Sequence, residues 1–297
     1  MSTNSDTHHD AGTYYVPHGS PWPILGSVAL FSIMLGAVSF LNDWAGGWSF
    51  IPGAAMLAFM FFGWFSTVIG ENQKGMFNLD VDKSFRMGMM WFIMSEVMFF
   101  AAFFGALFYA RQLSVPWIGG EGMKVFTKML LWQDYSPAWP TNGPAKVGGH
   151  ADGTFETIHA FGLPALNTAI LLTSGVTITI AHHALRAANR KVLGIFLAAT
   201  WMLGFLFVYL QATEYHEAYT ELGLKLSTGI YGSTFFMLTG FHGLHVTIGA
   251  IMLLIVWLRC MNGHFTPNRH FAFEAVAWYW HFVDVVWLIL FVFVYWI

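Results

Sequence analysis

The sequence predicts an all-α fold, that of a polytopic membrane protein with seven transmembrane helices. Hydrophobic residues make up 56% of the 297 positions and charged residues only 10%, whereas a soluble domain is about 25% charged. A helix that spans a bilayer needs about 20 apolar residues, and seven runs reach that length: 22–43, 48–70, 86–110, 158–185, 192–214, 228–258 and 272–297. No repeat of about 20–50 residues is visible, so residues 1–297 are expected to form one membrane domain.

The ends of the runs carry the aromatic residues that are typical of the two membrane surfaces. They are Trp22, Trp44, Trp48, Trp278, Tyr279, Trp280, Tyr295 and Trp296. The sixth run also has small residues four apart, Gly229 with Ser233 and Thr239 with Gly243, which would let a neighbouring backbone approach closely. We therefore expect the sixth and seventh helices to lie in the interior of the bundle.

An acidic residue lies at the centre of the third run. Between 87 and 108 only Ser95 and Glu96 are clearly polar, and an ionisable group inside the bilayer is energetically costly. Glu96 could relay protons, bind a cation, or join helices as a hydrogen-bonding group satisfied by Ser95 or by a neighbouring helix. Because acids inside a membrane are functional by default, a functional carboxyl is favoured over a purely structural one.

The distribution of Lys and Arg indicates how the helices are oriented. With the N-terminus inside, the short outward loops carry only Lys225, whereas the inward loops carry Lys74, Lys83, Arg86, Arg186, Arg190, Lys191, Arg259 and Arg269. The N-terminus is therefore predicted inside and the C-terminus outside. Thirteen basic and sixteen acidic residues, without a basic block, give no surface for a nucleic-acid partner.

Regions outside the runs bound the fold further. The outer connection 111–157 is rich in Trp, Pro and Gly and is expected to form an ordered or partly ordered cap. Met1 to Asp10 is polar and lacks the pattern of a cleaved signal peptide. Cys260 is the only cysteine, which excludes intrachain disulfides, CxxC redox pairs and c-type haem attachment.

Histidines within the runs suggest a metal centre as one alternative. His242 and His245 stand three apart and fall near one face of the sixth helix. Together with four further histidines, these two could ligate haem or a di-iron centre. The four are His159, His182, His183 and His281. A metal site needs converging ligands and supporting carboxylates, and neither HExxH nor HxxHH is present. Structural histidines that join helices are therefore favoured.

Two groups of acidic residues also have structural interpretations. His281 and Asp284 are three apart in the seventh run and can pair along the helix, which would offset the cost of burying either one. A second group follows the fifth run: Glu214, His216, Glu217 and Glu221. A solvated helix end is expected there rather than a divalent-cation site, because no spaced oxygen-ligand motif is present.

Arginines at the inward helix ends form a separate candidate site. Arg86, Arg259 and Arg269 are predicted there, with Trp64, Glu71 and His270 nearby in the topology. Arg suits bidentate recognition of phosphate, and basic pockets between transmembrane helices can hold lipid headgroups. Ordinary anchoring by positive charges on the inner side explains the same residues equally well.

Several long motifs resemble one known family. They occur in order as SPWP at 20–23, FIMSEVMFF at 92–100, LPALNTAILLTSG at 163–175, AHHAL at 181–185, YGSTFFMLTGFHGLHVTIG at 231–249 and FEAVAWYWHFVDVVW at 273–287. Together they cover nearly the whole chain and are similar to subunit III of the haem-copper cytochrome c oxidases, of the bacterial aa3 type.

The resemblance implies a fold and a set of partners. Seven helices would form a V-shaped arrangement, with the two-helix part 22–70 splayed from the five-helix part 86–297, an N-terminal inner segment 1–21 and an inner loop 71–85. The chain would carry no cofactor of its own and would dock mainly on oxidase subunit I, with subunit II in the same complex. Haems and copper are expected in those partner subunits, and phospholipids in the cleft of the V.

The resemblance also implies roles for individual residues. Glu96 matches the buried carboxyl that reacts with carbodiimides inside the bilayer. Positions that contact cleft lipids match Trp64, Arg86 and Arg259, while Arg269 and His270 stand at a pair usually written His-His. The remaining intramembrane polar residues would then be structural: His242, His245, His281 and Asp284.

One departure affects the lipid site. After Gly75 the family commonly has His-His-Thr, which includes a lipid-contacting histidine, whereas Met76, Phe77 and Asn78 follow here. A relative that serves a quinol oxidase or a nitric oxide reductase would share the bundle, and seven runs favour the cytochrome c branch.

The role implied by the resemblance is indirect. The chain would stabilise the catalytic subunit, maintain a lipid-filled route for oxygen and support proton uptake, in the inner membrane of a bacterium with a cytoplasmic N-terminus and a periplasmic C-terminus. Two rival classes are an autonomous membrane metalloenzyme that uses the histidines and a proton or ion transporter built around Glu96.

Overall fold

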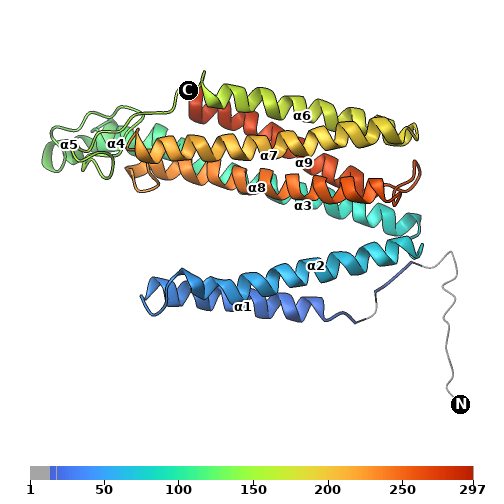
Figure 1. Cartoon of the computed structure of the whole chain (residues 1–297). Coiled ribbons are helices and arrows are strands. Elements are labelled where there is room, and N and C mark those ends of the chain that lie inside the picture. The colour runs from blue at the N-terminus through green and yellow to red at the C-terminus, as the bar shows by residue number, and fades with distance from the viewer. Residues whose placement is uncertain (1–13, 18, 297) are drawn as a thin grey trace, which may run out of the picture. The chain divides into compact units, whose positions relative to one another are not determined.

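The computed structural model describes residues 14–17 and 19–296, and the fold across them is all-α, as predicted (Figure 1). Within these described residues, seven helices are long and apolar enough to cross a membrane, which confirms the seven predicted runs. They are built on α1 (Trp22–Leu41), α2 (Ile51–Gln73), α3 (Leu79–Tyr109), α6 (Leu163–Arg186), α7 (Arg190–Thr220), α8 (Gly229–Met261) and α9 (Phe271–Leu290). The prediction for Met1 to Asp10 lies outside the described residues.

Some helices differ from their runs by five residues or more at one end, and one of them, α6, begins at Leu163 rather than at 158. α3 begins at Leu79 rather than at 86, because Asn78 accepts a hydrogen bond from the Val81 backbone N–H at 3.0 Å and Asp80 and Asp82 lie in the first turn. Asparagine caps and first-turn acids stabilise a helix start, although they lower local hydropathy. α7 likewise continues to Thr220, six residues past its run.

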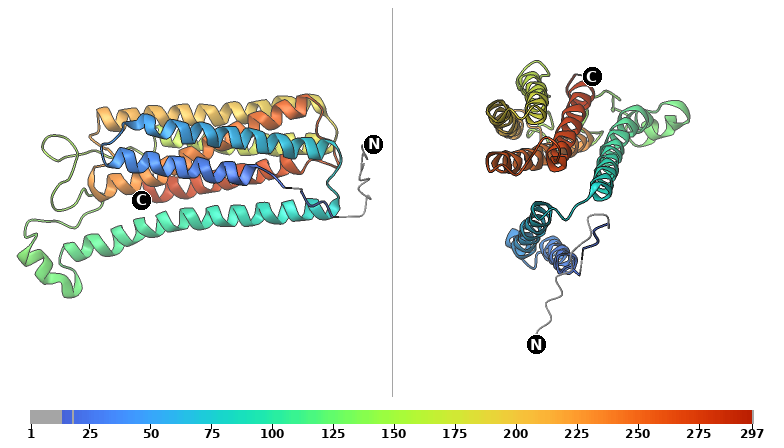
Figure 2. Two further views of the ribbon diagram at one scale, coloured as in Figure 1. Left: turned by 90° about the horizontal axis from the view of Figure 1, so that it is seen from below. Right: turned by 90° about the vertical axis from the view of Figure 1, so that its right-hand side faces the viewer.

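The chain divides into two compact units, Met1–Met87 and Gly88–Ile297. In the first unit α1 and α2 lie side by side (Figures 1 and 2). A Cβ atom on Gly53 would lie 2.7 Å from the backbone nitrogen of Ile33, so glycine permits this close approach. The Tyr15 hydroxyl donates to the Glu71 carboxylate at 2.9 Å, which fixes the entering chain against the end of α2.

In the second unit α8 and α9 are the most buried of the membrane helices, as predicted. Two fully buried indoles hold α9 against α6: Trp280 donates to the Ser174 hydroxyl and Trp287 to the Thr168 hydroxyl, each at 2.9 Å. A buried indole N–H needs such an acceptor. Hydroxyls on α6 therefore allow large aromatic residues to form the core of the unit.

The glycines that permit close packing are not those expected from spacing. A Cβ on Gly243 would meet nothing within 4 Å, so the prediction of helix approach there is wrong. At Gly204 of α7 and Gly249 of α8 a Cβ would lie 2.7 Å and 2.8 Å from the Trp280 ring. Gly229 has a φ of +52° and faces the Asn142 backbone, so it accommodates a loop and not a helix.

The connection 111–157 is ordered, in agreement with the predicted cap. It contains a π-helical stretch η2 (Ala110–Ser114), α4 (Val115–Ile118), η3 (Gly122–Lys124) and α5 (Val125–Leu130). Beyond them the backbone pairs with the helix ends: Tyr231 N–H donates to Thr141 at 3.2 Å and Glu156 N–H donates to Leu222 at 2.9 Å. These bonds attach the cap to the end of α7 and the start of α8.

Candidate functional site

The buried acid of the third helix has a partner on another helix. Glu96 Oε2 on α3 lies 2.9 Å from His245 Nε2 on α8, and the two side chains are only 20% and 12% exposed. Ser95 does not satisfy the acid, because its hydroxyl donates to the Phe92 carbonyl of its own helix at 2.7 Å. The sequence left two partners open for Glu96, Ser95 and a neighbouring helix, and the structure shows that a neighbouring helix, α8, supplies the partner.

The hydrogen bonds of His245 determine how many protons the pair holds. Its Nδ1 lies 2.6 Å from the Phe241 carbonyl oxygen, which can only accept, so Nδ1 carries a proton. The contact between Nε2 and the Glu96 carboxyl then needs one further proton, located on either atom. Both arrangements are neutral overall, which lowers the cost of placing the two groups inside a membrane.

Aromatic side chains enclose this pair. The Phe100 and Phe99 rings pack against the His245 ring with centroids 5.0 Å and 5.9 Å away, and Tyr279 of α9 stacks at 6.4 Å. The Tyr279 hydroxyl also donates to the His245 carbonyl at 3.3 Å. The arrangement joins α3, α8 and α9, and it can retain a proton away from water.

His242 points to different neighbours from His245. Its ring is fully buried between Phe207 and Trp287, and Nε2 lies 3.1 Å from the Val283 carbonyl of α9. Nε2 therefore donates to α9. The structure places this histidine in a contact between helices.

The predicted pair of His281 and Asp284 does not form in the part of the chain that the structure describes. His281 Nε2 lies 3.4 Å from the Thr179 hydroxyl of α6. Asp284 is 8% exposed and faces the same helix, where a Cβ on Gly175 would lie 2.7 Å from its Oδ2. The prediction was wrong because both side chains are directed to α6 and not along α9.

Glu214 is buried and does not lie at a solvated helix end. It is only 1% exposed, and its Oε1 accepts from the Tyr295 hydroxyl at 2.6 Å and from the Gln211 amide at 3.0 Å. The prediction was wrong for this residue because α7 continues past its apolar run. The other three members of that group are exposed as expected: His216, Glu217 and Glu221.

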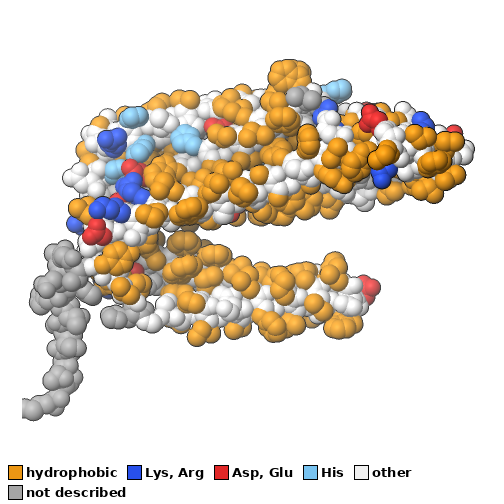
Figure 3. All heavy atoms as spheres, turned by 180° about the vertical axis from the view of Figure 1, so that it is seen from behind, with side chains coloured by type: hydrophobic (Ala, Val, Ile, Leu, Met, Phe, Trp, Pro, Cys, Tyr) orange, Lys and Arg blue, Asp and Glu red, His pale blue; other side chains and the backbone are white. Residues whose placement is uncertain are grey.

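Basic side chains and histidines gather at one end of the second unit (Figure 3). At the end of α8, the Arg259 guanidinium lies over the Phe265 ring at 4.5 Å. Among the described residues no carboxylate lies within ion-pair distance of it. Arg269 is exposed just before α9, while Arg190 donates to the carbonyls of Cys260 and Phe265.

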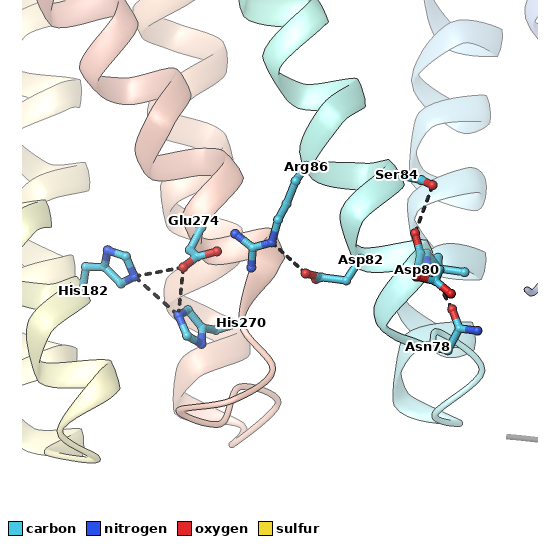
Figure 4. A network of polar contacts seen from close by, with 9 residues as sticks. Asn78, Asp80, Asp82, Ser84, Arg86, His182, His270 and Glu274 are labelled. Atoms are coloured by element: carbon cyan, nitrogen blue, oxygen red, sulfur yellow. Dashed lines mark hydrogen bonds and ion pairs between the residues drawn. The ribbon is translucent and has the colours of Figure 1, made fainter. Parts of the chain in front are cut away.

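The first unit carries the two other residues predicted to contact lipid. Arg86 forms an ion pair with Asp82 one turn earlier on α3, at 2.7 Å (Figure 4). Trp64 of α2 is 47% exposed and stacks on Phe65. The Arg86 guanidinium therefore has a carboxylate partner within its own unit, whereas the Arg259 guanidinium has none among the described residues.

Two histidines and a glutamate converge where α6 ends and α9 begins (Figure 4). His182 of α6, His270 at the start of α9 and Glu274 of its first turn offer ligand atoms within 4.8 Å of one another. Sequence reasoning considered His182 as a ligand and His270 as a lipid contact, separately. The missed signal is the spacing of His270 and Glu274, which puts both on one face of a helix start.

This architecture defines a multi-pass membrane protein with a neutral acid and histidine pair among its helices. The family model for cytochrome c oxidase subunit III matches residues 12–123 and 143–297. The cytochrome c oxidase subunit 3 of Dugong dugon is 40% identical over 97% of this chain and 98% of its own length, and those of Latimeria chalumnae and Oryctolagus cuniculus are each 39% identical over the same shares.

The chain belongs to the cytochrome c oxidase subunit III family, and the resemblance seen in its motifs is confirmed. It is therefore an accessory component of an oxidase complex in a membrane, and the family carries no redox cofactor of its own. Residues 124–142, which the family model does not match, fall within the cap.

Proposed function

We propose that this chain stabilises the catalytic subunit of a cytochrome c oxidase and binds phospholipids through its inner-side arginines. Oxidase subunit I is the main partner and subunit II belongs to the same complex, with haems and copper located in those partner subunits. Electrons pass there from cytochrome c to oxygen. The chain supports this reaction from outside, by maintaining structure, oxygen access and proton uptake.

The observation that best supports the lipid proposal is the environment of Arg259. Its guanidinium is held over Phe265, half-buried at a helix end, without a carboxylate among the described residues. A guanidinium placed over an aromatic ring keeps N–H donors available for a phosphate. Arg269, exposed nearby in the same unit, adds positive charge. Trp64 and Arg86 of the first unit and the ring of His270 are proposed as further lipid contacts on the strength of the family resemblance.

The experiment replaces Arg259 with alanine in the native complex and measures retained phospholipid by native mass spectrometry. Arg186 is the matched control, because it is an exposed arginine at the same end of the second unit and has no aromatic ring beneath it among the described residues. Arg259→Ala should lose at least one phospholipid per complex, whereas Arg186→Ala should retain the wild-type number. Equal phospholipid content in the two variants would remove the lipid assignment of Arg259.

The proposed oxygen route rests on bound lipid, and the proposed proton role rests on the family resemblance. Oxygen partitions into apolar media, so lipid held beside the bundle provides a path toward a buried catalytic site. We propose that the inner-side basic and histidine groups help to deliver protons.

We further propose that the chain lies in the inner membrane of a bacterium, with a cytoplasmic N-terminus and a periplasmic C-terminus. Impermeant maleimide applied to intact cells should label Lys225→Cys and spare Arg186→Cys. The opposite pattern would reverse the orientation.

A further inference from the structure

His182, His270 and Glu274 form a cluster whose convergence is not explained by the lipid contact proposed for His270 or by the proton delivery proposed for the inner-side histidines. Their side chains are 27%, 9% and 16% exposed. They come from two helices, α6 and α9, whose ends meet there (Figure 4). Such convergence of side chains from distant parts of the sequence is what a metal site needs and what the sequence alone did not reveal.

The separations of the three ligand atoms match one face of a tetrahedron around zinc. His182 Nε2 lies 3.4 Å from His270 Nε2 and 3.6 Å from Glu274 Oε1, and His270 Nε2 lies 3.2 Å from Glu274 Oε1. A tetrahedral zinc ion with bonds of about 2.0–2.2 Å places its ligands about 3.3–3.6 Å apart. An ion could therefore bind all three atoms with little movement of the side chains.

The tautomer of His270 is already set for metal binding. Its Nδ1 lies 3.2 Å from the Thr266 carbonyl oxygen, so Nδ1 carries the proton and Nε2 presents a lone pair to the cluster. Metal-bound histidines in proteins almost always donate their other N–H to a carbonyl or a carboxylate in this way. The contact between His270 and Thr266 is independent of the three distances within the cluster, and it also indicates a metal-binding site.

The chemistry of the donors selects the ion. Two neutral imidazoles and one carboxylate form a set that zinc uses, with a fourth position left for water, whereas magnesium and calcium prefer oxygen ligands alone. Zinc has no redox chemistry, so its binding agrees with a family without redox cofactors. We propose that His182, His270 and Glu274 bind one zinc ion that ties the end of α6 to the start of α9.

The test uses the purified oxidase complex that contains the full chain, after chelation and equilibration with zinc chloride. Zinc per complex is measured by mass spectrometry for the wild type and for three variants, His182→Ala, His270→Gln and Glu274→Gln. His183→Ala is the matched control, because His183 is the next residue, is exposed and lies outside the cluster. The wild type and His183→Ala should bind one zinc ion more than each cluster variant.

Cobalt(II) provides a second readout of the same site. Recorded as a difference between the same complex with and without cobalt, so that the haem bands cancel, the wild-type spectrum should show the visible absorption of a tetrahedral cobalt ion, and Glu274→Gln, the variant closest in shape to the wild type, should lose it. Equal zinc content in the wild type and in Glu274→Gln, or cobalt spectra that do not differ between them, would overturn the assignment. Neither result depends on whether Arg259 binds lipid.

Discussion

At the scale of single residues, three titratable groups inside the membrane helices have partners on other helices. Glu96 pairs with His245, His242 with the Val283 carbonyl, and Glu214 with Tyr295. Each contact joins two helices, and the first is neutral because one proton serves both groups. An ionisable residue can therefore be retained in a membrane helix without any catalytic role.

The pair predicts different outcomes for two substitutions of the same residue. Glu96→Ala leaves the buried Nε2 of His245 without its partner, which should cost about 1–3 kcal/mol and lower the thermal midpoint of the purified complex. Glu96→Gln can still hydrogen-bond to the imidazole, so its midpoint should stay near the wild type, with haem content unchanged and turnover altered modestly. Thermal unfolding and an optical spectrum measure these effects.

Ser95→Ala is the control, because among the described residues the Ser95 hydroxyl bonds only to a carbonyl of its own helix. It should behave as the wild type in both assays. A Gln variant as unstable as the Ala variant would contradict the hydrogen-bonding account, and loss of the haem spectrum in the Gln variant would contradict the indirect role.

At the scale of the helices, Trp280 is the point where four of them meet. Its ring lies against Gly204 of α7 and Gly249 of α8, while its N–H donates to Ser174 of α6. In a bilayer, helix association depends on close packing and on interhelical hydrogen bonds, because lipid is as apolar as the helix surfaces. Around the Trp280 indole, the two glycines allow close packing and Ser174 accepts the interhelical hydrogen bond.

Adding one methyl group tests this packing. Gly249→Ala should destabilise the second unit by about 1–3 kcal/mol, because the new Cβ would lie 2.8 Å from the Trp280 ring and 3.2 Å from the Tyr279 ring. The thermal midpoint of the purified complex should fall accordingly. Gly243→Ala, on the same helix with nothing within 4 Å, should change stability by less than about 0.5 kcal/mol. Equal effects of the two changes would show that the contact does not limit packing.

At the scale of the whole molecule, the helices could be predicted from the sequence, whereas most of their contacts could not. Run length and composition are local properties, so all seven spans were found. The partner of Glu96 is 149 residues away on another helix, and the cluster of His182 with His270 and Glu274 joins residues 88 positions apart or more. Such contacts depend on how helices pack, which periodicity does not encode.

The errors of prediction have related causes. Gly243 has the right spacing for close approach, but spacing does not say which helix face meets a neighbour. The end of the apolar run predicts a solvent-exposed Glu214. In the structure α7 continues past this residue, and the Tyr295 hydroxyl donates a hydrogen bond to its carboxylate. The motifs that resemble subunit III were more informative about the fold than residue spacing, because members of one family share the same helix packing.

The central claim is that this chain is a non-redox accessory subunit, and metal and haem analysis of the purified chain tests it most directly. The native complex should be isolated, the chain separated from its partners, and iron, copper and the visible spectrum measured in both fractions. The account predicts that the chain co-purifies with subunits that contain haem and copper, and that the separated chain contains neither iron nor copper. Stoichiometric iron or copper in the separated chain, or oxygen consumption by it alone, would contradict the account.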